Sequence, residues 1–364
     1  MSLPNGIPAP VFRVPSHINP RFAFSSLGGR YVLLAFLPGP GPERDAALTL
    51  VADRGDLFRD DHILFFGVLA DAASYDQAPQ TRPFRWFGDF DGLVRRKYSA
   101  VDADGGVQPQ WVLVDPSQRI LASAPLQYGR EIMAVVAQLP APDDHAGVPL
   151  HAPVLIVPRV FDPTLCRRLM DVYARHGGRP SGVMRQFGDK TVGVLDHSKK
   201  RRDAPVVDEQ LRAEINAQIV ARLMPEVEKA FQFKATVIER YIVACYDAET
   251  GGYFRPHRDN TTAGTAHRKF AVSINLNAEA FEGGDLRFPE FGTRTYRPPT
   301  GGAVVFSCSL LHEATAVTRG QRFAFLPFLY DEAGAKLREA NQHLLINPPG
   351  GVDPAAEIDA PAGP

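Results

Sequence analysis

Short apolar runs and one amphipathic stretch organise the first third of the chain. Residues 31–37 and 62–69 are almost continuously apolar and are bounded by turn-forming residues, as is typical of strands buried on both faces of a sheet. Residues 45–59 carry apolar side chains at helical spacing, so the order strand, helix, strand predicts a βαβ unit. Two further apolar runs, 110–114 and 120–124, flank the turn DPSQR and predict a hairpin. We therefore expect an α/β domain here.

A proline-rich segment separates this region from a different pattern. Residues 139–153 read LPAPDDHAGVPLHAP, which has almost no apolar periodicity and predicts a linker. Two helices are expected beyond it, residues 163–176, which end at a Gly-Gly pair, and residues 208–231, which Pro225 should kink. The strands expected after these helices are 236–246, 270–276, 285–288, 302–309 and 322–330. Many strands after a helical start predict an α+β domain built on a sandwich or barrel.

Composition and charge exclude several classes of protein. The 364 residues include 40 basic and 41 acidic side chains, and this balance argues against a nucleic-acid partner. The longest apolar runs have seven and eight residues, whereas a bilayer span needs ~20, so we expect no membrane segment. The N-terminus lacks the basic start and apolar stretch of a secretory signal. Three cysteines at unrelated spacings fit no disulfide framework, and a cytoplasmic location is expected.

The candidate chemistry centres on an H-x-D pair, His257 and Asp259, which follows an expected strand and turn. In extended backbone, residues i and i+2 point to the same side, so His257 and Asp259 can face one point. His312 follows the apolar strand AVVFSCSLL, at the end of which the chain can return to that point. Two histidines and one carboxylate on one face form the facial triad of non-haem Fe(II) oxygenases. Arg322, ten residues after His312, offers a planar fork that fits the distal carboxylate of 2-oxoglutarate. The H-x-D pair by itself also occurs by chance in many chains.

The second half of the chain resembles the prolyl 4-hydroxylase-type Fe(II)/2-oxoglutarate dioxygenases. The matching text comprises YDAETGGYFRPHRDN, FAVSINLN, FEGGDLRFPEFG and RPPTGGAVVFSCSLLHEATAVTRGQRFAFLPFLY. The resemblance implies a double-stranded β-helix, or jelly roll. It also implies Fe(II), 2-oxoglutarate and O2 as cofactor and cosubstrates, with ascorbate as an optional addition, and a hydroxylation that releases succinate and CO2.

The same resemblance assigns roles to residues. It implies that His257, Asp259 and His312 ligate Fe(II). It implies that Arg322 takes the C5 carboxylate of 2-oxoglutarate and that Tyr246 hydrogen-bonds this cosubstrate. Asp259 argues against the related halogenases, which have a small non-ligating residue at this position. Asn275 stands where many relatives have a tyrosine. We therefore expect contacts around 2-oxoglutarate that differ in detail.

The first half resembles the peroxiredoxin-like thioredoxin fold over residues 6–137, through LGGRYVLLAFLPGPGPERDAAL, ILFFGVLAD and PQWVLVDPSQRILAS. In that family a peroxidatic cysteine lies shortly after the strand YVLLAFLP. Residues 39–50 contain no cysteine, and the first one in the chain is Cys166. Because a thiolate is needed to attack a peroxide, we expect this domain to be a redox-inactive scaffold.

Together these patterns predict an α/β thioredoxin-like domain followed by an α+β domain built on a double-stranded β-helix. The expected boundaries are a thioredoxin/peroxiredoxin-like domain over residues 1–140, a linker over 141–153, a dioxygenase domain over 154–335 and a disordered tail over 347–364.

The substrate and the role of the first domain stay open. A prolyl residue of a protein or peptide, a free amino acid and a small metabolite are all compatible with the resemblance, and the sequence does not determine the oligomeric state. A contrasting hypothesis is a non-catalytic binding module with a relic metal site, which recruits partners through the thioredoxin-like half. The intact set of His257, Asp259, His312 and Arg322 argues against it, because a lapsed site should lose at least one of them.

A basic run, Lys199 to Arg202, has two interpretations. A solvated loop is the simpler one, and a substrate-facing lid is the alternative, because the corresponding segment often covers the pocket in the resembling family. We expect Cys245 and Cys308, which fall within strands, to be structural thiols. His197 and His267 have no metal-ligand spacing and are expected to be structural or surface residues.

Overall fold

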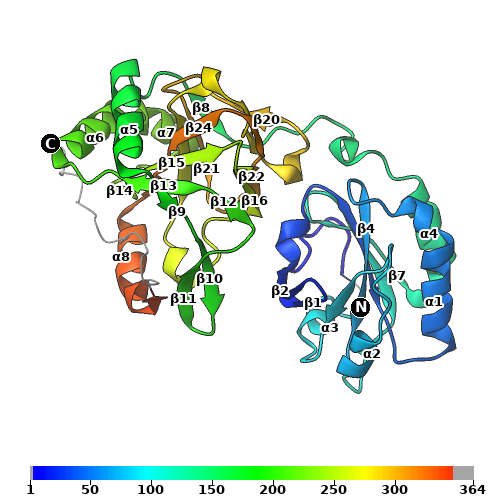
Figure 1. Cartoon of the computed structure of the whole chain (residues 1–364). Coiled ribbons are helices and arrows are strands. Elements are labelled where there is room, and N and C mark those ends of the chain that lie inside the picture. Colours follow the sequence, from blue (N-terminus) through cyan, green and yellow to red (C-terminus); the bar gives the residue numbers. More distant parts are fainter. Residues whose placement is uncertain (1–2, 347–364) are drawn as a thin grey trace. The chain divides into compact units, whose positions relative to one another are not determined.

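The computed structural model describes residues 3–346, and the predicted disordered tail over 347–364 lies outside the described residues. The chain forms two compact units (Figure 1). The first comprises the chain up to Ala152 and the short segment Pro289–Thr293; the second comprises Pro153–Phe288 and the chain from Arg294 on. Within the described range, no helix is both long and apolar enough to cross a bilayer.

The first unit is built on a five-stranded mixed sheet with the order β5-β4-β3-β6-β7. The parallel strands β3 (Tyr31–Phe36) and β4 (Ile63–Leu69) are joined by α1 (Pro42–Asp53), which confirms the predicted βαβ unit. β6 (Gln110–Val114) and β7 (Ile120–Pro125) form the predicted antiparallel hairpin, with β6 antiparallel to β3. On the other side, β5 (Trp86–Gly88) adds a third parallel strand beside β4.

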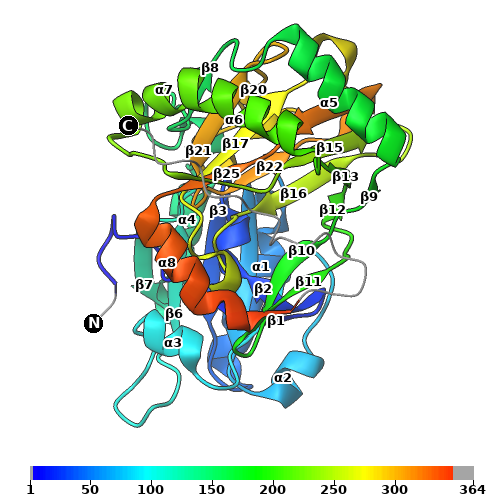
Figure 2. The same cartoon turned by 90° about the vertical axis from the view of Figure 1, so that its left-hand side faces the viewer.

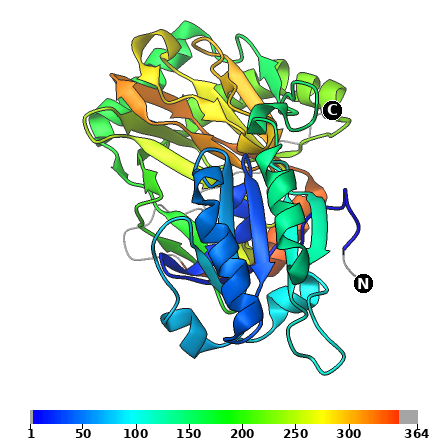
Figure 3. The same cartoon turned by 90° about the vertical axis from the view of Figure 1, so that its right-hand side faces the viewer.

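Both faces of this sheet are covered, which explains the continuous apolar runs of its central strands. Apolar side chains of α1 and α4 (Gly129–Ala137) pack on one face, and Figure 3 shows the two helices side by side. The N-terminal segment, with β1 (Arg13–Ser16) and β2 (Asn19–Ala23), packs on the other face together with α3 (Leu93–Lys97). A further short helix is α2 (Ala72–Asp76).

Local signals determine the helices of the second unit. α5 (Pro163–His176) has the predicted bounds, because the Asp162 side chain accepts hydrogen bonds from the N–H groups of its first turn and Gly177 ends it with a φ of 76°. The predicted kinked helix over 208–231 is instead two helices, α6 (Glu209–Arg222) and α7 (Met224–Phe231). Pro225 lies in the first turn of α7, where a missing N–H costs nothing, so the proline starts a new helix.

Two main sheets accompany the helices of the second unit, besides two small sheets of three and two strands. The larger sheet has the order β14-β25-β17-β24-β15-β13-β9, with β21 and β8 attached beside β17; the smaller has the order β12-β16-β22-β19-β20. The strands of the larger sheet are β8 (Leu155–Val157), β9 (Arg179–Pro180), β13 (Arg202–Pro205), β14 (Val237–Glu239), β15 (Ile242–Asp247), β17 (Phe270–Asn275), β21 (Ala303–Ser307), β24 (Gln321–Phe325) and β25 (Phe328–Tyr330). Those of the smaller sheet are β12 (Lys199–Lys200), β16 (Tyr253–His257), β19 (Leu286–Arg287), β20 (Thr295–Tyr296) and β22 (His312–Ala314).

The main core of the second unit lies between the larger sheet and the helices α5, α6 and α7. Figure 2 shows these helices along one side of the sheet strands. The opposite face of the larger sheet shares a pocket with the smaller sheet, because residues of β15, β17 and β24 and residues of β16, β19 and β22 line the same cavity. The fold thus leaves one face of the larger sheet free for a site.

Four further features of this unit differ from the sequence prediction. The expected strand 236–246 is interrupted at Arg240, which has a φ of 72°, and the expected strand 322–330 is interrupted at Leu326 and Pro327. The hairpin β10 (Val183–Phe187) and β11 (Lys190–Val194) was not predicted. Neither was α8 (Glu332–Asn341), a polar helix that the strand pattern before it gave no reason to expect.

Candidate active site

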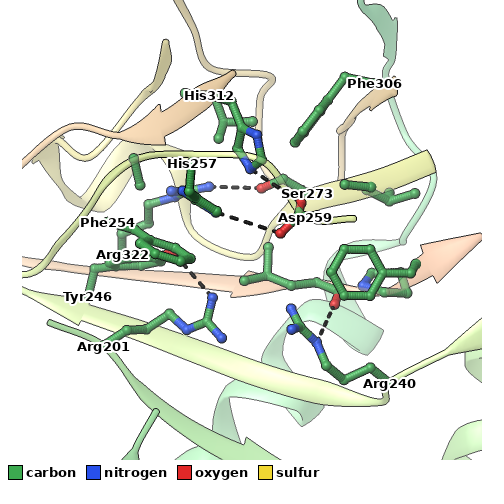
Figure 4. A pocket seen from close by; sticks show the side chains of 17 residues that line it. Arg201, Arg240, Tyr246, Phe254, His257, Asp259, Ser273, Phe306, His312 and Arg322 are labelled. Atoms are coloured by element: carbon green, nitrogen blue, oxygen red, sulfur yellow. Dashed lines mark hydrogen bonds and ion pairs between the residues drawn. The ribbon is translucent and has the colours of Figure 1, made fainter. Parts of the chain in front are cut away.

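The structure brings His257, Asp259 and His312 together in the pocket between the two sheets (Figure 4). His257 ends β16 and His312 begins β22, and the two residues are direct cross-strand partners. Asp259 Oδ1 lies 3.6 Å from His257 Nε2, and Asp259 Oδ2 lies 3.3 Å from His312 Nε2. One ligand atom from each of the three residues lies within 4.8 Å of the others. The H-x-D pair and the distant histidine therefore meet as their spacing predicts.

Hydrogen bonds fix the orientation of both imidazole rings. His257 Nδ1 lies 2.8 Å from the Arg255 carbonyl oxygen, and His312 Nδ1 lies 3.0 Å from that of Leu310. A carbonyl oxygen only accepts, so each Nδ1 carries a proton, and in the neutral ring it is Nε2 that offers the lone pair. Both Nε2 atoms face the Asp259 carboxylate, and a two-imidazole, one-carboxylate set with hydrogen-bonded outer nitrogens fits Fe(II).

Burial and mutual charge set the protonation states of this group. Burial raises the pKa of the Asp259 carboxyl, but the neighbouring His312 and His257 outweigh it and bring the pKa well below its usual value. Burial, together with His257, lowers the pKa of His312 to about 4. At neutral pH the carboxylate is therefore ionised and the His312 imidazole is neutral, as metal ligands must be.

Arg322 lies on the larger sheet at the same pocket and is 3% exposed. Its Nη2 donates to Ser273 Oγ at 2.8 Å, and its Nε donates to Asn275 Oδ1 at 3.4 Å. Within the described part of the chain, no carboxylate lies within 4.0 Å of this guanidinium group. Burial lowers its pKa, which is the signature of a desolvated cation. We expect this buried guanidinium group to bind an anionic ligand.

Tyr246 and Asn275 surround this arginine. Tyr246 is the cross-strand partner of Arg322, whose guanidinium carbon lies 5.2 Å from the centre of the tyrosine ring. The Asn275 side chain bridges from Arg322 to the Pro298 carbonyl oxygen, to which its Nδ2 donates at 2.8 Å. The residue at which this sequence departs from the resembling family thus supports the arginine itself.

The solvated-loop interpretation of Lys199 to Arg202 is wrong for two of the four residues. Lys199 and Arg201 are buried, whereas Lys200 and Arg202 are exposed, because the segment is extended and alternate side chains point inward. Arg201 forms a two-pronged ion pair with Asp203, with Nε–Oδ1 at 2.7 Å and Nη2–Oδ2 at 2.6 Å.

Both buried cations of this run lie at or near the pocket. Arg201 lines it and donates from Nη1 to the hydroxyl oxygen of Tyr246 at 3.4 Å. Lys199 donates to Ser181 Oγ at 2.7 Å and to the Gly182 carbonyl oxygen at 2.8 Å. The period-two pattern, with Asp203 in phase with Arg201, was the signal in the sequence that could have revealed this.

Several pocket residues were not anticipated from the sequence. The Phe254 ring stacks on the His257 imidazole with centroids 3.4 Å apart, and Phe306 lies beside His312. Ser273 could have been found from the alternation in FAVSIN, which places it on the same side as Asn275. The sequence did not indicate that Arg240 lines the pocket, because its position there depends on a break in the strand.

The lining of the pocket does not include His197, His267, Cys245 or Cys308. His267 is buried and bonds to Glu239 Oε2 at 2.7 Å, and His197 is exposed. Burial raises the pKa of the Cys245 thiol to about 11 and that of the Cys308 thiol well above its usual value, so both are unreactive thiols at neutral pH.

Residues 241–330 match the family model of the 2OG-Fe(II) oxygenase superfamily, and this segment contains the His-Asp-His group and Arg322. The second unit carries a 2OG-Fe(II) oxygenase domain. This finding confirms the predicted cofactor and cosubstrates, Fe(II), 2-oxoglutarate and O2, and the prediction of a 2-oxoglutarate-dependent dioxygenase.

Similar proteins include a PKHD-type hydroxylase of Shewanella sp. (strain ANA-3), which is 28% identical over 170 residues, or 44% of this chain and 71% of the relative. Among solved structures, a viral collagen prolyl hydroxylase from Paramecium Bursaria Chlorella virus-1 has a TM-score of 0.37 and 16% identity, covering 48% of this chain and 94% of its own. A putative protein disulfide isomerase from Bacteroides thetaiotaomicron has a TM-score of 0.34 and 19% identity, covering 40% of this chain and 98% of its own.

Proposed function

We propose that the oxygenase domain hydroxylates its substrate with His257, Asp259 and His312 as the Fe(II) ligands and with Arg322 and Tyr246 as the 2-oxoglutarate contacts. The observation that carries this proposal is the convergence of three ligand atoms within 4.8 Å in the pocket that also holds an arginine without an acidic partner among the described residues. When bound, iron with 2-oxoglutarate and O2 supplies the oxidation of a C–H bond to C–OH, with release of succinate and CO2.

The side chains supply geometry and environment. The carbonyl oxygens of Arg255 and Leu310 hold the two imidazoles in the tautomer that presents Nε2 to the metal. Asp259 contributes the negative charge that offsets the cation. Arg322 holds a carboxylate in a fixed orientation through its fork, which Ser273 positions from behind. Apolar side chains around these groups keep water out of the pocket; they include Val272, Leu286, Phe306, Leu326 and Phe328.

We assign the fold of this domain to the double-stranded β-helix, over residues 154–335, and the two sheets that share the pocket support the assignment. For the first unit we propose a thioredoxin-like domain over residues 1–140, followed by a linker over 141–153. Its central βαβ unit and antiparallel hairpin support this. Because its sequence contains no cysteine, we assign it a scaffold role without redox chemistry.

The substrate class follows from the names of the relatives only in outline. The PKHD-type and prolyl hydroxylases favour a prolyl residue of a protein or peptide, and a free amino acid or small metabolite fits the same chemistry.

Turnover of 2-oxoglutarate tests the proposal. Purified protein with Fe(II), 2-oxoglutarate and O2 should release succinate, and Asp259→Ala should abolish the release. A matched control, Glu282→Ala, removes an exposed carboxylate of the same unit that pairs with Arg319, and it should retain the activity. Equal succinate release by Asp259→Ala and native protein would contradict the proposed ligand set. No release by native protein that has bound Fe(II) and 2-oxoglutarate would favour a non-catalytic binding module.

A further inference from the structure

One cation in the pocket has no role in the chemistry proposed above. Three guanidinium groups, those of Arg201, Arg240 and Arg322, line the cavity. Arg201 is neutralised by Asp203, and Arg322 is the proposed contact of 2-oxoglutarate. Arg240 is left over, and Figure 4 shows its guanidinium group on the opposite side of the pocket from that of Arg322.

The charges around Arg240 are already committed to other groups. The ionised groups that act on it most strongly are Arg201, Arg268, Asp203 and Asp259. Asp203 pairs with Arg201, Arg268 pairs with Glu239, and Asp259 belongs to the proposed metal site. No carboxylate of the described residues lies within 4.0 Å of the Arg240 guanidinium group. Arg240 therefore forms no ion pair with a described carboxylate, and Asp203 and Asp259 act on it only from farther away.

The hydrogen-bonding capacity of Arg240 is also mostly unused. Its Nε donates to the Leu326 carbonyl oxygen at 3.2 Å, and its guanidinium group lies over the Phe328 ring, 4.6 Å from the ring centre. These two contacts fix the plane of the fork. The N–H groups of both Nη atoms have no hydrogen-bond partner in the described part of the chain and are not sealed in the interior. These N–H groups face the cavity and are free to donate hydrogen bonds to a ligand.

The backbone places Arg240 there at some cost. Its φ of 72° lies in the left-handed region, which a long side chain seldom adopts. The break that this conformation makes between β14 and β15 lies opposite the break at Leu326 and Pro327 between β24 and β25. A strained residue at paired strand breaks, with its side chain aimed into a functional pocket, is typical of a ligand contact.

We infer that Arg240 binds a carboxylate of the substrate that is hydroxylated. This inference rests on the proposed function, since it assumes that Arg322 is occupied by 2-oxoglutarate. A planar fork with two vacant donors matches a carboxylate, which it can bind through two parallel hydrogen bonds. The substrate class is therefore a small carboxylic acid, such as a free amino acid or a molecule that presents a terminal carboxylate, rather than an uncharged internal segment of a peptide.

Binding of matched probes tests this inference. We would titrate N-acetyl-L-proline against N-acetyl-L-prolinamide, and cyclopentanecarboxylate against cyclopentanecarboxamide, by calorimetry in the presence of Mn(II) and saturating 2-oxoglutarate. The members of each pair differ only in the charge that Arg240 would recognise. Native protein should bind the carboxylates about tenfold to a hundredfold more tightly than the amides, the ratio that a charge-assisted hydrogen bond provides.

The decisive variant is Arg240→Asn, because asparagine tolerates a left-handed φ and removes the charge. It should bring the two members of each pair to within about twofold of each other, and Arg240→Lys should keep part of the preference. Arg319→Asn, an exposed arginine of the same unit, is the matched control and should keep the full preference. Circular dichroism would show that each variant is folded.

Several outcomes would overturn the inference. The first is equal or absent binding of the carboxylate and the amide of each pair by native protein. The second is a preference for the carboxylate that survives in folded Arg240→Asn. A third is loss of 2-oxoglutarate affinity in Arg240→Asn with the preference intact, which would make Arg240 a cosubstrate contact. If native protein binds no 2-oxoglutarate, the proposed function fails. The probes are then titrated into Arg322→Asn and the Arg322→Asn, Arg240→Asn double variant, where the same preference still decides the role of Arg240.

Discussion

Two neighbouring residues, Glu239 and Arg240, enter two charged regions of the same unit: Glu239 is fully buried and Arg240 is partly buried at the pocket. Glu239 joins a closed cluster, in which its carboxylate bonds to His267 Nε2 at 2.7 Å and to Arg268 Nη2 at 2.6 Å. Arg240 enters the pocket, where its fork and that of Arg322 have no acidic partner among the described residues. The charge of Glu239 is thus paired within the chain, whereas those of Arg240 and Arg322 are not paired by any described carboxylate.

The comparison separates stability from function. A buried charge that is paired and hydrogen-bonded within the chain serves the fold, whereas a buried charge left unpaired is tolerated only where something else binds it. Burial raises the pKa of Glu239, but Arg268 and His267 outweigh it and bring that pKa well below its usual value. Burial instead dominates at Arg322, whose pKa is lowered. The predictions below test whether removing charges from the two regions has these different consequences.

The largest effect is expected at the open region, from Asp259→Ala. Removing the carboxylate eliminates one of three proposed metal ligands, so succinate release should fall by about three orders of magnitude or more. The metal-free variant should lose less thermal stability than Glu239→Ala does, because Asp259 forms no ion pair with a guanidinium group and its pKa is lowered mainly by the two imidazoles. Strong destabilisation of the metal-free variant would place Asp259 with the structural cluster instead.

Arg322→Ala comes next. We expect the dissociation constant of 2-oxoglutarate to rise by about thirtyfold to a thousandfold, which is the loss from truncating one partner of a buried charge pair. Calorimetry with Mn(II)-loaded protein measures this without turnover. Arg319→Ala, on the exposed surface, is the reference and should leave the constant unchanged. An unaltered constant in Arg322→Ala would show that 2-oxoglutarate is held elsewhere.

Glu239→Ala should lower the stability of the second unit, whereas the two variants above mainly affect the cofactor site. It leaves Arg268 and His267 buried without their shared acid, and we expect the free energy of unfolding of the second unit to fall by about 3–5 kcal/mol. Denaturant unfolding followed by circular dichroism measures this loss. Glu282→Ala, which breaks an exposed pair, should cost about 0–1 kcal/mol. A loss as small as that of Glu282→Ala would mean that the closed cluster contributes little to the fold.

The smallest effect concerns pH. The pKa of Glu239 is lower in the folded protein than its ordinary value of 4.5, so its stabilising contribution is complete above that value. The contribution is lost progressively as the pH falls below 4.5 toward the folded-state pKa. We expect the unfolding midpoint of native protein to drop by a few degrees more than that of Glu239→Gln over this interval, by calorimetric scans of the metal-free proteins. If the unfolding midpoints of native protein and Glu239→Gln fall equally with pH, the stabilising contribution assigned to the Glu239 carboxylate is contradicted.

Predictions from the sequence were correct for features that depend on residues close to one another along the chain. The bounds of α5 follow from Asp162 and Gly177. His257 and Asp259 meet as the H-x-D spacing predicts, although Asp259 lies in the turn after β16 and not in the strand itself. Prediction failed where long-range packing decides. The period-two pattern of residues 199–203 separates two sets of side chains, but which set points inward depends on pairing with other strands.

Arg240 shows the limit most clearly. Its local sequence reads as the middle of one apolar strand, and nothing nearby predicts a left-handed residue there. The break exists because β14 pairs with β25 while β15 pairs with β24, and those partners are separated by Pro327. The periodicity of residues 236–246 cannot reveal a property that depends on an interruption 86 residues further along the chain.

The central claim, that the His-Asp-His group and Arg322 form one cofactor site, is tested most directly by anaerobic titration of Fe(II) and 2-oxoglutarate into the purified protein. The visible charge-transfer band of the Fe(II)–2-oxoglutarate complex reports both ligands at once. We predict a band in the native protein that Asp259→Ala abolishes and that Arg322→Ala shifts to much higher 2-oxoglutarate concentrations. A native protein without the band, or a band that neither substitution changes, would contradict the claim.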